Sequence, residues 1–420
     1  MSVENMGSKT LRSVLESLES GSRPKGGVSG ISDGIPSIGA EHLNADGGFC
    51  FDRIKYIPKE YASRLRRGRI QQGDVLIVKD GATTGKVTYV DQQYPFAESY
   101  VNEHVFICRP SQEVCGRYLF YFLRSNSGNS QIMATFHGAA QGGISSAFVD
   151  EVDVPLPPIE DQKRIIEILD AILLKVKLVK LRLDKIPMLL KDFRQSVLSA
   201  AYSGQLTESW RNFAHPNYLP MKINDLIESI KYGTAAKCSK EPVGVPILRI
   251  PNIQGGYVDS SNLKYAVLDE VEKNNLELSE GDLLLVRSNG SVDLVGRTAL
   301  IRSEDTQYGY AGYLMRLRLN KEIVSPEFLN FCFQSYDMRL QIQLPARSTT
   351  GVHNINSTEV KNLELNVPPL DEQQEIVRII NLLYSIADSM ESKYQKAMAR
   401  IDKIEQSILS KTFCSGLRKV

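Results

Sequence analysis

The hexapeptide Pro157-Pro158-Ile159-Glu160-Asp161-Gln162 returns 211 residues later as Pro368-Pro369-Leu370-Asp371-Glu372-Gln373. The match continues without a gap, so that residues 157–206 can be laid on residues 368–417. A match of this length indicates a tandem duplication, and a chain built from two similar halves is expected to have an approximate internal two-fold axis. Such proteins tend to bind two related targets, or one target that has two parts.

Each hexapeptide is followed by apolar residues in a strict 4-3 alternation. The first copy has Ile165, Leu169, Ile172, Val176, Val179, Leu183, Ile186, Leu190, Phe193 and Val197, and the second has Ile376, Ile380, Leu383, Ala387, Met390, Tyr394, Ala397, Ile401, Ile404 and Ile408. A sustained period of 3.5 residues is typical of a helix that packs along a narrow stripe against another helix. Because the two stripes match, we expect the helices to pair with each other as an antiparallel coiled coil. A third helix, of the same domain or of another chain, is the alternative partner.

Sequence signals also predict where the two helices begin and bend. Tandem prolines can precede a helix or occupy its first turn, and the acidic residues that follow them suit the positive end of its dipole. If each helix runs for about 45 residues, it is on the order of 65 Å long. Pro187 predicts a kink or break near residues 184–186 of the first helix. Met398 stands at that position in the second copy, which should therefore be straighter.

The segments before the two helices also repeat, with small gaps. Gln72-Gly73-Asp74-Val75-Leu76-Ile77-Val78 answers Glu280-Gly281-Asp282-Leu283-Leu284-Leu285-Val286. Apolar runs at 75–78, 87–90 and 104–108, with counterparts at 283–286, 298–301 and 314–319, predict strands. Residues 116–124 and 325–334 predict short helices, the second with Ser325 as its cap and Pro326 at its first position. The prediction is an α+β fold, with mixed α/β domains at residues 1–156 and 211–367 separated by helical spacers at 157–210 and 368–420.

Composition and charge limit the class of protein. A chain of 420 residues that is 42% hydrophobic and 24% charged is expected to be globular, with two to four domains. The first residues carry no secretory signal, and no stretch approaches the roughly 20 apolar residues of a membrane helix, so a cytoplasmic protein is expected. The six cysteines have no C-x-x-C pair and no histidine at ligand spacing, which favours buried reduced thiols. The formal charge of +1 still allows a basic face that is balanced elsewhere.

With its modules and helical segments in this order, the sequence resembles the specificity subunit of Type I restriction-modification systems. The likeness spans nearly all of the chain. In that family two target recognition domains alternate with two similar helical regions, which open with Pro-Pro and an acidic-acidic-Gln triplet as residues 157–162 and 368–373 do. The end of the first region, residues 194–211, is also similar to the family. The second copy departs from the first in having Ser415 in place of Gly204, so its helix is expected to end differently.

The resemblance implies a subunit without catalysis of its own. Family members bind an asymmetric DNA sequence in two blocks separated by unspecified bases, and each recognition domain reads one block in the major groove. The helices set the spacing and dock two methyltransferase subunits, which modify adenine with S-adenosylmethionine. Two motor and nuclease subunits, which use ATP and Mg²⁺, join for restriction. The expected partners are therefore double-stranded DNA and these subunits, and no cofactor is expected in this chain.

Basic residues of the first module are the first candidates for DNA contact. Seven of them lie between Asp52 and Gln72 against two acidic residues, and the densest group is Arg64, Arg66, Arg67 and Arg69. This density suits phosphate contact, and an arginine can also hold a guanine edge with two hydrogen bonds. A solvated helix face is the alternative.

Polar loops supply the other candidates. Residues 81–86, Gly-Ala-Thr-Thr-Gly-Lys, follow a strand but fail the Walker A pattern, because the loop is one residue short and continues with Val87. Nucleotide hydrolysis is therefore not expected, although the loop could offer backbone N–H groups and hydroxyls to DNA. Residues 137–146 and 347–356 are polar loops whose side chains could read base edges. Simple turns are the alternative for these residues.

We therefore expect no catalytic and no metal-binding residue, and DNA-facing residues in both modules. In the first module they are Arg64, Arg66, Arg67, Arg69, Lys79, Thr83, Thr84, Lys86, His137, Gln141 and Ser145. In the second they are Lys237, Lys240, Arg287, Ser288, Asn289, Arg347, Ser348, Thr349, Thr350, His353 and Asn354. The alternative function is a non-catalytic, two-headed coiled-coil adaptor that binds protein partners. An independent enzyme is disfavoured, because methyltransferase and cofactor motifs are missing from the sequence.

Overall fold

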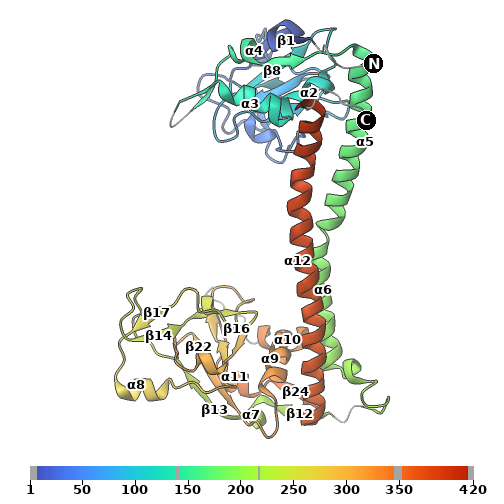
Figure 1. Ribbon diagram of the computed structural model, residues 1–420. Helices are drawn as coiled ribbons and strands as arrows, with labels where there is room; N and C mark the ends of the chain where they lie inside the picture. The colour runs from blue at the N-terminus through green and yellow to red at the C-terminus, as the bar shows by residue number, and fades with distance from the viewer. Residues whose placement is uncertain (1–6, 139–141, 216–217, 345–351, 415–420) are drawn as a thin grey trace. The chain divides into compact units, whose positions relative to one another are not determined.

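The computed structural model describes residues 7–138, 142–215, 218–344 and 352–414, and it mixes helices and strands (Figure 1). The chain divides into two compact units. The first unit comprises Met1–Asp184 and Gln395–Val420, and the second comprises Lys185–Tyr394. Each unit holds one of the repeated modules together with long helical segments.

The module of the first unit is built on a four-stranded antiparallel sheet. Its strand order is β2 (Leu15–Ser20), β8 (Val105–Pro110), β5 (Val75–Val78) and β6 (Val87–Tyr89). A three-stranded sheet holds β4 (Lys55–Ile57), β3 (Ile35–Ile38) and β7 (Tyr100–Val101), and two-stranded pairs join β1 (Ser8–Thr10) to β11 (Asp153–Pro155) and β9 (Phe136–His137) to β10 (Gly143–Ile144). The short helices are η1 (Leu11–Val14), η2 (Ala40–His42), α1 (Lys59–Ala62), α2 (Gly116–Arg124), α3 (Asn126–Ala134) and α4 (Phe148–Glu151).

The module of the second unit repeats this plan with a larger sheet. Its six strands are β13 (Ile227–Tyr232), β22 (Leu314–Leu319), β18 (Leu283–Val286), β20 (Thr298–Leu300), β16 (Gly256–Val258) and β15 (Ile253–Gln254). The smaller sheets hold β17 (Lys264–Ala266), β14 (Val245–Leu248) and β21 (Gly309–Tyr310), then β12 (Leu219–Lys222) with β24 (Glu364–Val367), and β19 (Ser288–Asn289) with β23 (His353–Asn354). The short helices are η3 (Gln205–Thr207), α7 (Ile223–Leu226), η4 (Ile250–Asn252), α8 (Glu270–Asn275), η5 (Ser303–Asp305), α9 (Pro326–Gln334), α10 (Tyr336–Gln343) and α11 (Ser357–Lys361).

The repeated Gly-Asp sequence before each central strand explains why the two modules fold alike. Strands β5 and β18 are buried along their whole length, and they pair with β8 and β22 in the same register. The aspartate that precedes each strand is also buried and binds an arginine of the neighbouring strand. Asp74 lies 2.9 Å from Arg109, and Asp282 lies 2.8 Å from Arg318. The strands and short helices predicted from the sequence are confirmed, including the Ser325 cap of α9.

One glycine in each module permits a close backbone crossing. Gly21 follows β2, and a Cβ built on it would overlap the carbonyl oxygen of Val101. Gly233 follows β13, and a Cβ there would overlap the carbonyl oxygens of Tyr310 and Ala311. A side chain at these positions would push the end of β2 or β13 away from the three-stranded sheet of its module.

The long helices follow the modules as the sequence predicts. Helix α5 (Ile159–Leu183) ends just before Pro187, and α6 (Ile186–Tyr202) continues after a turn, whereas α12 runs unbroken over Leu370–Cys414. The break near Pro187 is confirmed, and the second copy has no such break. Helix α12 contributes its first part to the second unit and its last part to the first unit.

The glutamine of each hexapeptide fastens the helix to its module by three hydrogen bonds. The Nε2 atom of Gln162 donates to the carbonyl oxygens of Pro157 (2.9 Å) and Glu113 (3.1 Å), and its Oε1 accepts from the amide of Cys115 (2.8 Å). Gln373 makes the same bonds to Pro368 (2.8 Å), Ile323 (2.9 Å) and Ser325 (2.7 Å). Both side chains are completely buried, so this residue type is structurally required at the start of each long helix.

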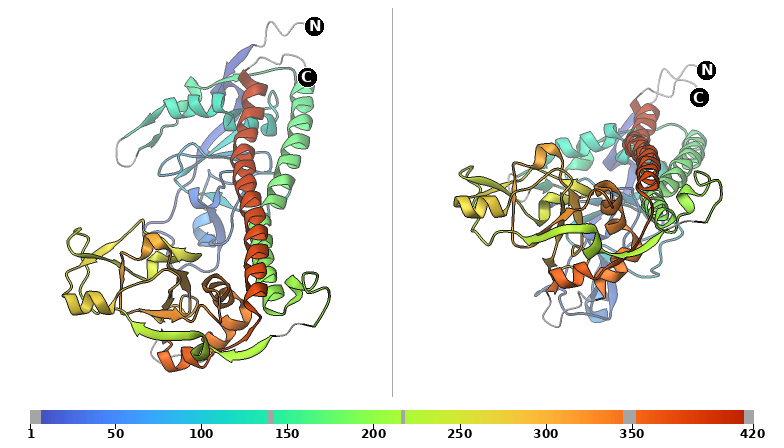
Figure 2. Two further views of the ribbon diagram at one scale, coloured as in Figure 1. Left: turned by 60° about the horizontal axis from the view of Figure 1, so that its bottom comes forward. Right: turned by 90° about the horizontal axis from the view of Figure 1, so that it is seen from below.

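Within each unit, the helices lie side by side in opposite directions (Figures 1 and 2). In the first unit Lys180 of α5 is 2.8 Å from Asp402 of α12, and Leu409 packs with Ile165 and Leu169. In the second unit Arg194 of α6 binds Asp388 and Glu391 at 2.7 and 2.9 Å, and Val197 and Ala201 pack with Ile376 and Ile380.

Parts of the apolar stripes are not covered within either unit. The exposed members of the two series are Ile172, Val179, Phe193, Met390 and Ile404. These five residues are therefore only partly covered by the helix that packs beside them in their own unit. A cysteine prediction also needs correction. Of the five cysteines whose burial the structure describes, Cys108 and Cys332 are buried, while Cys50, Cys115 and Cys238 are partly exposed. Among the residues described, no helix is long and apolar enough to cross a membrane.

Candidate nucleic-acid interface

Two polar segments that are distant in sequence meet at the end of the central strand in both modules. In the first module, the amide of Ile144 donates to the carbonyl oxygen of Lys79 at 2.8 Å, which places the β9–β10 hairpin beside the segment that follows β5. In the second module, the amide of Ile355 donates to the carbonyl oxygen of Arg287 at 2.8 Å, and β19 pairs with β23. The structure therefore brings together the candidates of residues 79–86 and 137–145, and likewise those of 287–289 and 353–354.

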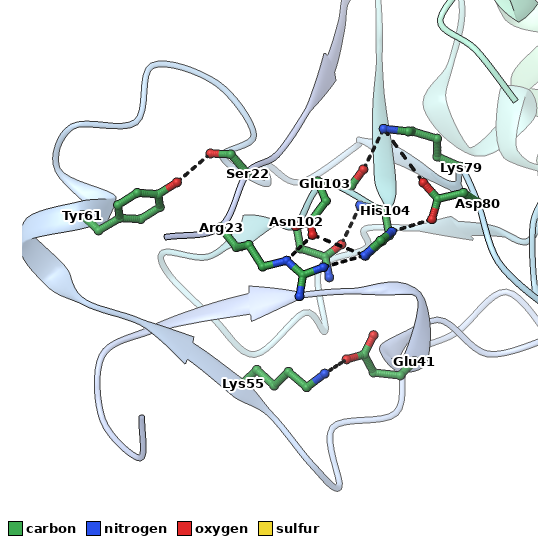
Figure 3. Close-up of polar contacts among 10 residues, drawn as sticks. All are labelled: Ser22, Arg23, Glu41, Lys55, Tyr61, Lys79, Asp80, Asn102, Glu103 and His104. Atoms are coloured by element: carbon green, nitrogen blue, oxygen red, sulfur yellow. Dashed lines mark hydrogen bonds and ion pairs between the residues drawn. The ribbon is translucent and has the colours of Figure 1, made fainter. Parts of the chain in front are cut away.

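A charged cluster occupies this position in the first module (Figure 3). The Nζ atom of Lys79 donates to the carbonyl oxygen of Glu103 at 3.0 Å and lies 4.0 Å from Asp80. The imidazole of His104 lies between carboxylates, with Nδ1 2.5 Å from Asp80 and Nε2 3.3 Å from Glu103. Arg23 forms an ion pair with Glu103 and places Nη2 2.9 Å from Nε2 of His104. Arg23, Lys79 and the imidazole of His104 thus contact two carboxylates on a partly exposed surface.

A hydrogen bond of Tyr61 connects the arginine-rich segment to the chain beside this cluster. The hydroxyl groups of Tyr61 and Ser22 are 3.0 Å apart, and Ser22 precedes Arg23 (Figure 3). Lys55, one of the seven basic residues, is bound to Glu41 at 2.5 Å. Burial alone would raise the pKa of Glu41, but the hydrogen bond from Lys55 and the nearby positive charges hold that pKa below its ordinary value. Lys55 is therefore less available for DNA than the sequence suggests.

The four arginines of the segment are exposed. Arg64, Arg66, Arg67 and Arg69 form no ion pair with any carboxylate in the described part of the chain. Helix α1 ends at Ala62, so the alternative of a solvated helix face is wrong. Arg64, Arg66 and Arg67 stand on irregular backbone, and Arg69 forms a β-bridge with Tyr100. Exposed guanidinium groups without intramolecular partners can neutralise phosphates.

The loop of residues 81–86 makes more hydrogen bonds to its own module than predicted. The amides of Gly81, Thr84, Gly85 and Lys86 donate to carbonyl oxygens of the module itself, and the Thr84 hydroxyl donates to Gly81 at 2.7 Å. Lys86 donates through Nζ to the carbonyl oxygen of Leu43 at 3.3 Å. The expectation that this loop offers its backbone N–H groups is therefore wrong for these four residues, and Lys86 has a structural contact. Thr83 is partly exposed and stays a candidate.

Other candidates of the first module flank the hairpin. His137 is exposed at the end of β9, and Ser145 is exposed just after β10, where its hydroxyl accepts from the amide of Ala147 at 3.3 Å. Gln141 lies outside the described residues. Where the sequence predicted a loop at residues 137–146, the structure has a short antiparallel pair of strands, β9 and β10.

The second module presents an arginine that lies over an aromatic ring at the same position. The guanidinium carbon of Arg287 lies 4.6 Å from the centroid of the Tyr232 ring, and the hydroxyl of Tyr232 accepts from the amide of Ser357 at 3.0 Å. Tyr313, whose carbonyl oxygen accepts from the amide of Arg287 at 2.9 Å, is 62% exposed. Unlike the first module, this site has no carboxylate bound to its cation among the residues described.

The remaining candidates of the second module do not all lie at the Arg287 site. Lys237 and Lys240 are exposed, and Ser239 between them pairs with Tyr265 of β17, so they belong to the smaller sheet rather than to the Arg287 site. Ser288, Asn289, His353 and Asn354 form the β19–β23 pair, which the sequence suggested to be loops. Arg347, Ser348, Thr349 and Thr350 lie outside the described residues.

Sequence reasoning missed several residues of these sites. They are Arg23, Asp80, Glu103, His104 and Tyr232. One signal could have found three of them, since Asp80, His104 and Tyr232 lie at or next to the ends of apolar strands, where a sheet delivers side chains to one edge. Their hydrogen-bonding groups can donate to and accept from base edges. Within the described ranges, no group of three or more histidine, cysteine or carboxylate residues is arranged to hold a metal ion.

Comparison with known proteins assigns the family. The model of the Type I restriction modification DNA specificity domain matches residues 4–188 and 217–398. The EcoKI specificity subunit of Escherichia coli (strain K12) is 32% identical over 385 residues, which cover 91% of this chain and 82% of that protein. The StySPI specificity subunit of Salmonella potsdam is 30% identical over 384 residues, with the same coverage of 91% and 82%.

A solved structure supports the fold. The HsdS subunit from Thermoanaerobacter tengcongensis aligns with a TM-score of 0.61 at 18% identity, covering 98% of this chain and 97% of that one. A chain from a solved type I R-M system aligns with a TM-score of 0.69, also at 18% identity, and covers 96% of both chains. Both halves of the protein, each with its module and its hexapeptide, fall within the matched regions, and the chain therefore belongs to the Type I restriction-modification DNA specificity family.

Proposed function

We propose that this protein is the sequence-recognition subunit of a Type I restriction-modification complex, and that it selects DNA without catalysing a reaction on it. One observation carries the proposal. The family model matches both halves of the chain, and both halves place polar side chains at the same end of their central strand. A duplicated reader of this kind suits a target made of two different blocks, because each module can evolve its own contacts on a common frame.

The two repeated kinds of segment suggest two different roles. We propose that residues 1–156 and 211–367 are the two recognition domains, and that residues 157–210 and 368–420 are spacers related by an internal pseudo-two-fold. The antiparallel contacts of α5 with α12 and of α6 with α12 support an antiparallel coiled coil between the spacers. Two readers on successive major-groove faces of one duplex need centres about 34 Å apart, which rods of this length can set.

The proposed partners follow from the family. Modification and restriction subunits assemble with a specificity subunit, and we propose two copies of each, in keeping with the two-fold. The cofactors S-adenosylmethionine, ATP and Mg²⁺ would be bound by those subunits rather than by this chain. Exposed apolar residues on the helices, such as Leu174, Met188, Leu189 and Leu382, are available to contact them. A complex that acts on cellular DNA is expected in the cytoplasm.

Methylation sequencing tests the proposal. The chain is expressed with its modification subunit in cells that lack other adenine methyltransferases, and methylated adenines are mapped over the genome. We expect one asymmetric motif with two specified blocks and a gap of fixed length. The control omits this chain and should give no motif. A two-headed protein adaptor would leave the methylation pattern the same with and without the chain, which would refute the proposal.

A further inference from the structure

We propose that Arg287 reads a guanine in the DNA block recognised by the second module, and that Tyr232 holds its guanidinium in the plane required. This inference rests on the proposed function and names the chemistry of one of its sites. It assigns a base-specific role to one residue, whereas the exposed arginines of residues 64–69 suit phosphate contact.

The backbone of Arg287 is fixed on both sides. Its amide donates to the carbonyl oxygen of Tyr313 at 2.9 Å, and its own carbonyl oxygen accepts from the amide of Ile355 at 2.8 Å. Arg287 directly follows Val286, the last residue of the buried strand β18. A side chain that starts from a rigid strand end can be placed more accurately than one on a free loop, as base reading requires.

The orientation of the guanidinium is also fixed. It lies over the ring of Tyr232 at 4.6 Å, and the bond from the amide of Ser357 holds the hydroxyl of that tyrosine at 3.0 Å. An arginine stacked on an aromatic ring keeps its planar fork pre-organised, so less conformational entropy is lost when it binds.

Most of the donors of Arg287 have no hydrogen-bond partner among the residues that the structure describes. Nη1 donates weakly to the carbonyl oxygen of Gly312 at 3.5 Å, and Nε is buried with no hydrogen-bond partner among the described residues. No carboxylate of the described chain lies within ion-pair distance of the guanidinium. Leaving a charged group so poorly satisfied is unfavourable unless a ligand completes its hydrogen bonds.

The first module has different neighbours around the cation at the equivalent position. Lys79 occupies the position of Arg287 and donates to the carbonyl oxygen of Glu103, as Arg287 does to that of Gly312. In place of the carboxylates Asp80 and Glu103, however, the second module has Ser288 and Gly312. The first module thus surrounds its cation with acceptors, whereas the second leaves a planar donor unopposed.

Guanine is the base that matches an unopposed planar donor. Its N7 and O6 are two acceptors side by side in the major groove, and arginine binds them with two parallel hydrogen bonds. A phosphate could also accept from Arg287, but it would need only the charge and not the stacking that fixes the plane. The two possibilities predict different behaviour of a lysine variant, which keeps the charge and loses the fork.

The test compares Arg287→Lys with Arg302→Lys in the methylation experiment described above. Arg302 is a matched control, because its guanidinium also stacks on a tyrosine of the same module, Tyr257, at 4.1 Å. We expect R287K to lose discrimination at one G·C pair in one block of the motif. The loss should be roughly 5- to 150-fold, which corresponds to about 1–3 kcal/mol for a bidentate contact. R302K should leave the motif unchanged.

A second measurement changes the DNA rather than the protein. Binding of the wild-type complex is measured on duplexes in which that guanine is replaced by 7-deazaguanine, which lacks the N7 acceptor. We expect weaker binding by the wild type and no further loss for R287K. The inference is overturned if R287K leaves every position of the motif intact, or if it weakens binding evenly across sequences and lowers the salt slope by about one, as a phosphate contact would. Absence of any motif with the wild-type chain would instead refute the proposed function.

Discussion

Replacing Gln373 with alanine should detach the long helix α12 from the second module. Gln373 is fully buried, and its side chain is the hydrogen-bond partner of the Ser325 amide and of the carbonyl oxygens of Ile323 and Pro368. The substitution leaves three buried backbone groups unsatisfied, each at a cost of at least about 1 kcal/mol. With the cavity left by the side chain, we expect a loss of about 3–5 kcal/mol in the free energy of opening this junction.

Hydrogen exchange measured by mass spectrometry suits this prediction. The chain has two units, so a single unfolding free energy is not well defined, whereas exchange reports the opening of each region separately. Peptides that cover Ser325 and the first turns of α12 should lose protection in the Q373A variant, and peptides of the first unit should not. Gln162→Ala should produce the mirror result at Cys115 and the start of α5.

Gln374 provides the matched control. It is the next residue of the same helix and is exposed, so Gln374→Ala should change the opening free energy by no more than about 0.5 kcal/mol. If Q373A and Q374A are equally protected, the hexapeptide glutamine does not fasten the helix, and its three hydrogen bonds do not explain why the same residue stands at the start of both long helices.

Three further predictions concern stability. Gly21→Ala and Gly233→Ala should each destabilise their module by several kcal/mol, because their Cβ atoms would overlap backbone oxygens. Gly290→Ala is the control, since no atom lies within 4 Å of its Cβ. Equal melting temperatures for the three variants would contradict this prediction. Glu372→Ala should cost about 3–5 kcal/mol in the free energy of opening at the start of α12. Glu372 is buried and accepts from Thr207 (2.6 Å), Tyr218 (3.0 Å) and Arg211, whose charge the variant would leave without a carboxylate. Hydrogen exchange with the exposed Asp371→Ala as the control measures this cost, and equal protection of the two variants would contradict it. Burial raises the pKa of Tyr94, Tyr310 and Tyr384 to about 12. Because the folded state retains these protons, the associated stability is complete below pH of about 10 and is lost as pH rises toward 12. Absorbance at 295 nm should therefore show tyrosines that do not titrate near pH 10 while the protein is folded, and complete titration of the folded protein near pH 10 would contradict this.

Local sequence signals were enough to predict the repeated elements. The buried runs Val75–Val78 and Leu283–Val286, the cap at Ser325 and the break at Pro187 each depend on neighbouring residues and appear where expected. The stripe of apolar residues predicted the helices correctly, but it could not show which turns stay exposed, because that depends on the surfaces placed beside them.

The sites were harder to predict because their members come from distant segments. The Arg23–Glu103–His104 cluster joins residues about 80 positions apart, and the Tyr232–Ser357 contact joins residues 125 positions apart. No local pattern marks such pairs. Neither the charge count, which included Lys55, nor the loop pattern that suggested Lys86 could show that these lysines contact Glu41 and the carbonyl oxygen of Leu43, respectively.

Exchange of one recognition module would show most directly whether two independent readers share this chain. Residues 1–156 are replaced by the corresponding part of the EcoKI relative, and the methylated motif is mapped for the chimera and the wild type. If each module reads its own stretch of DNA on a common frame, one block of the motif should change while the other block and the gap stay as they were. A chimera that folds and methylates but alters both blocks, or neither, would contradict the independence of the two modules.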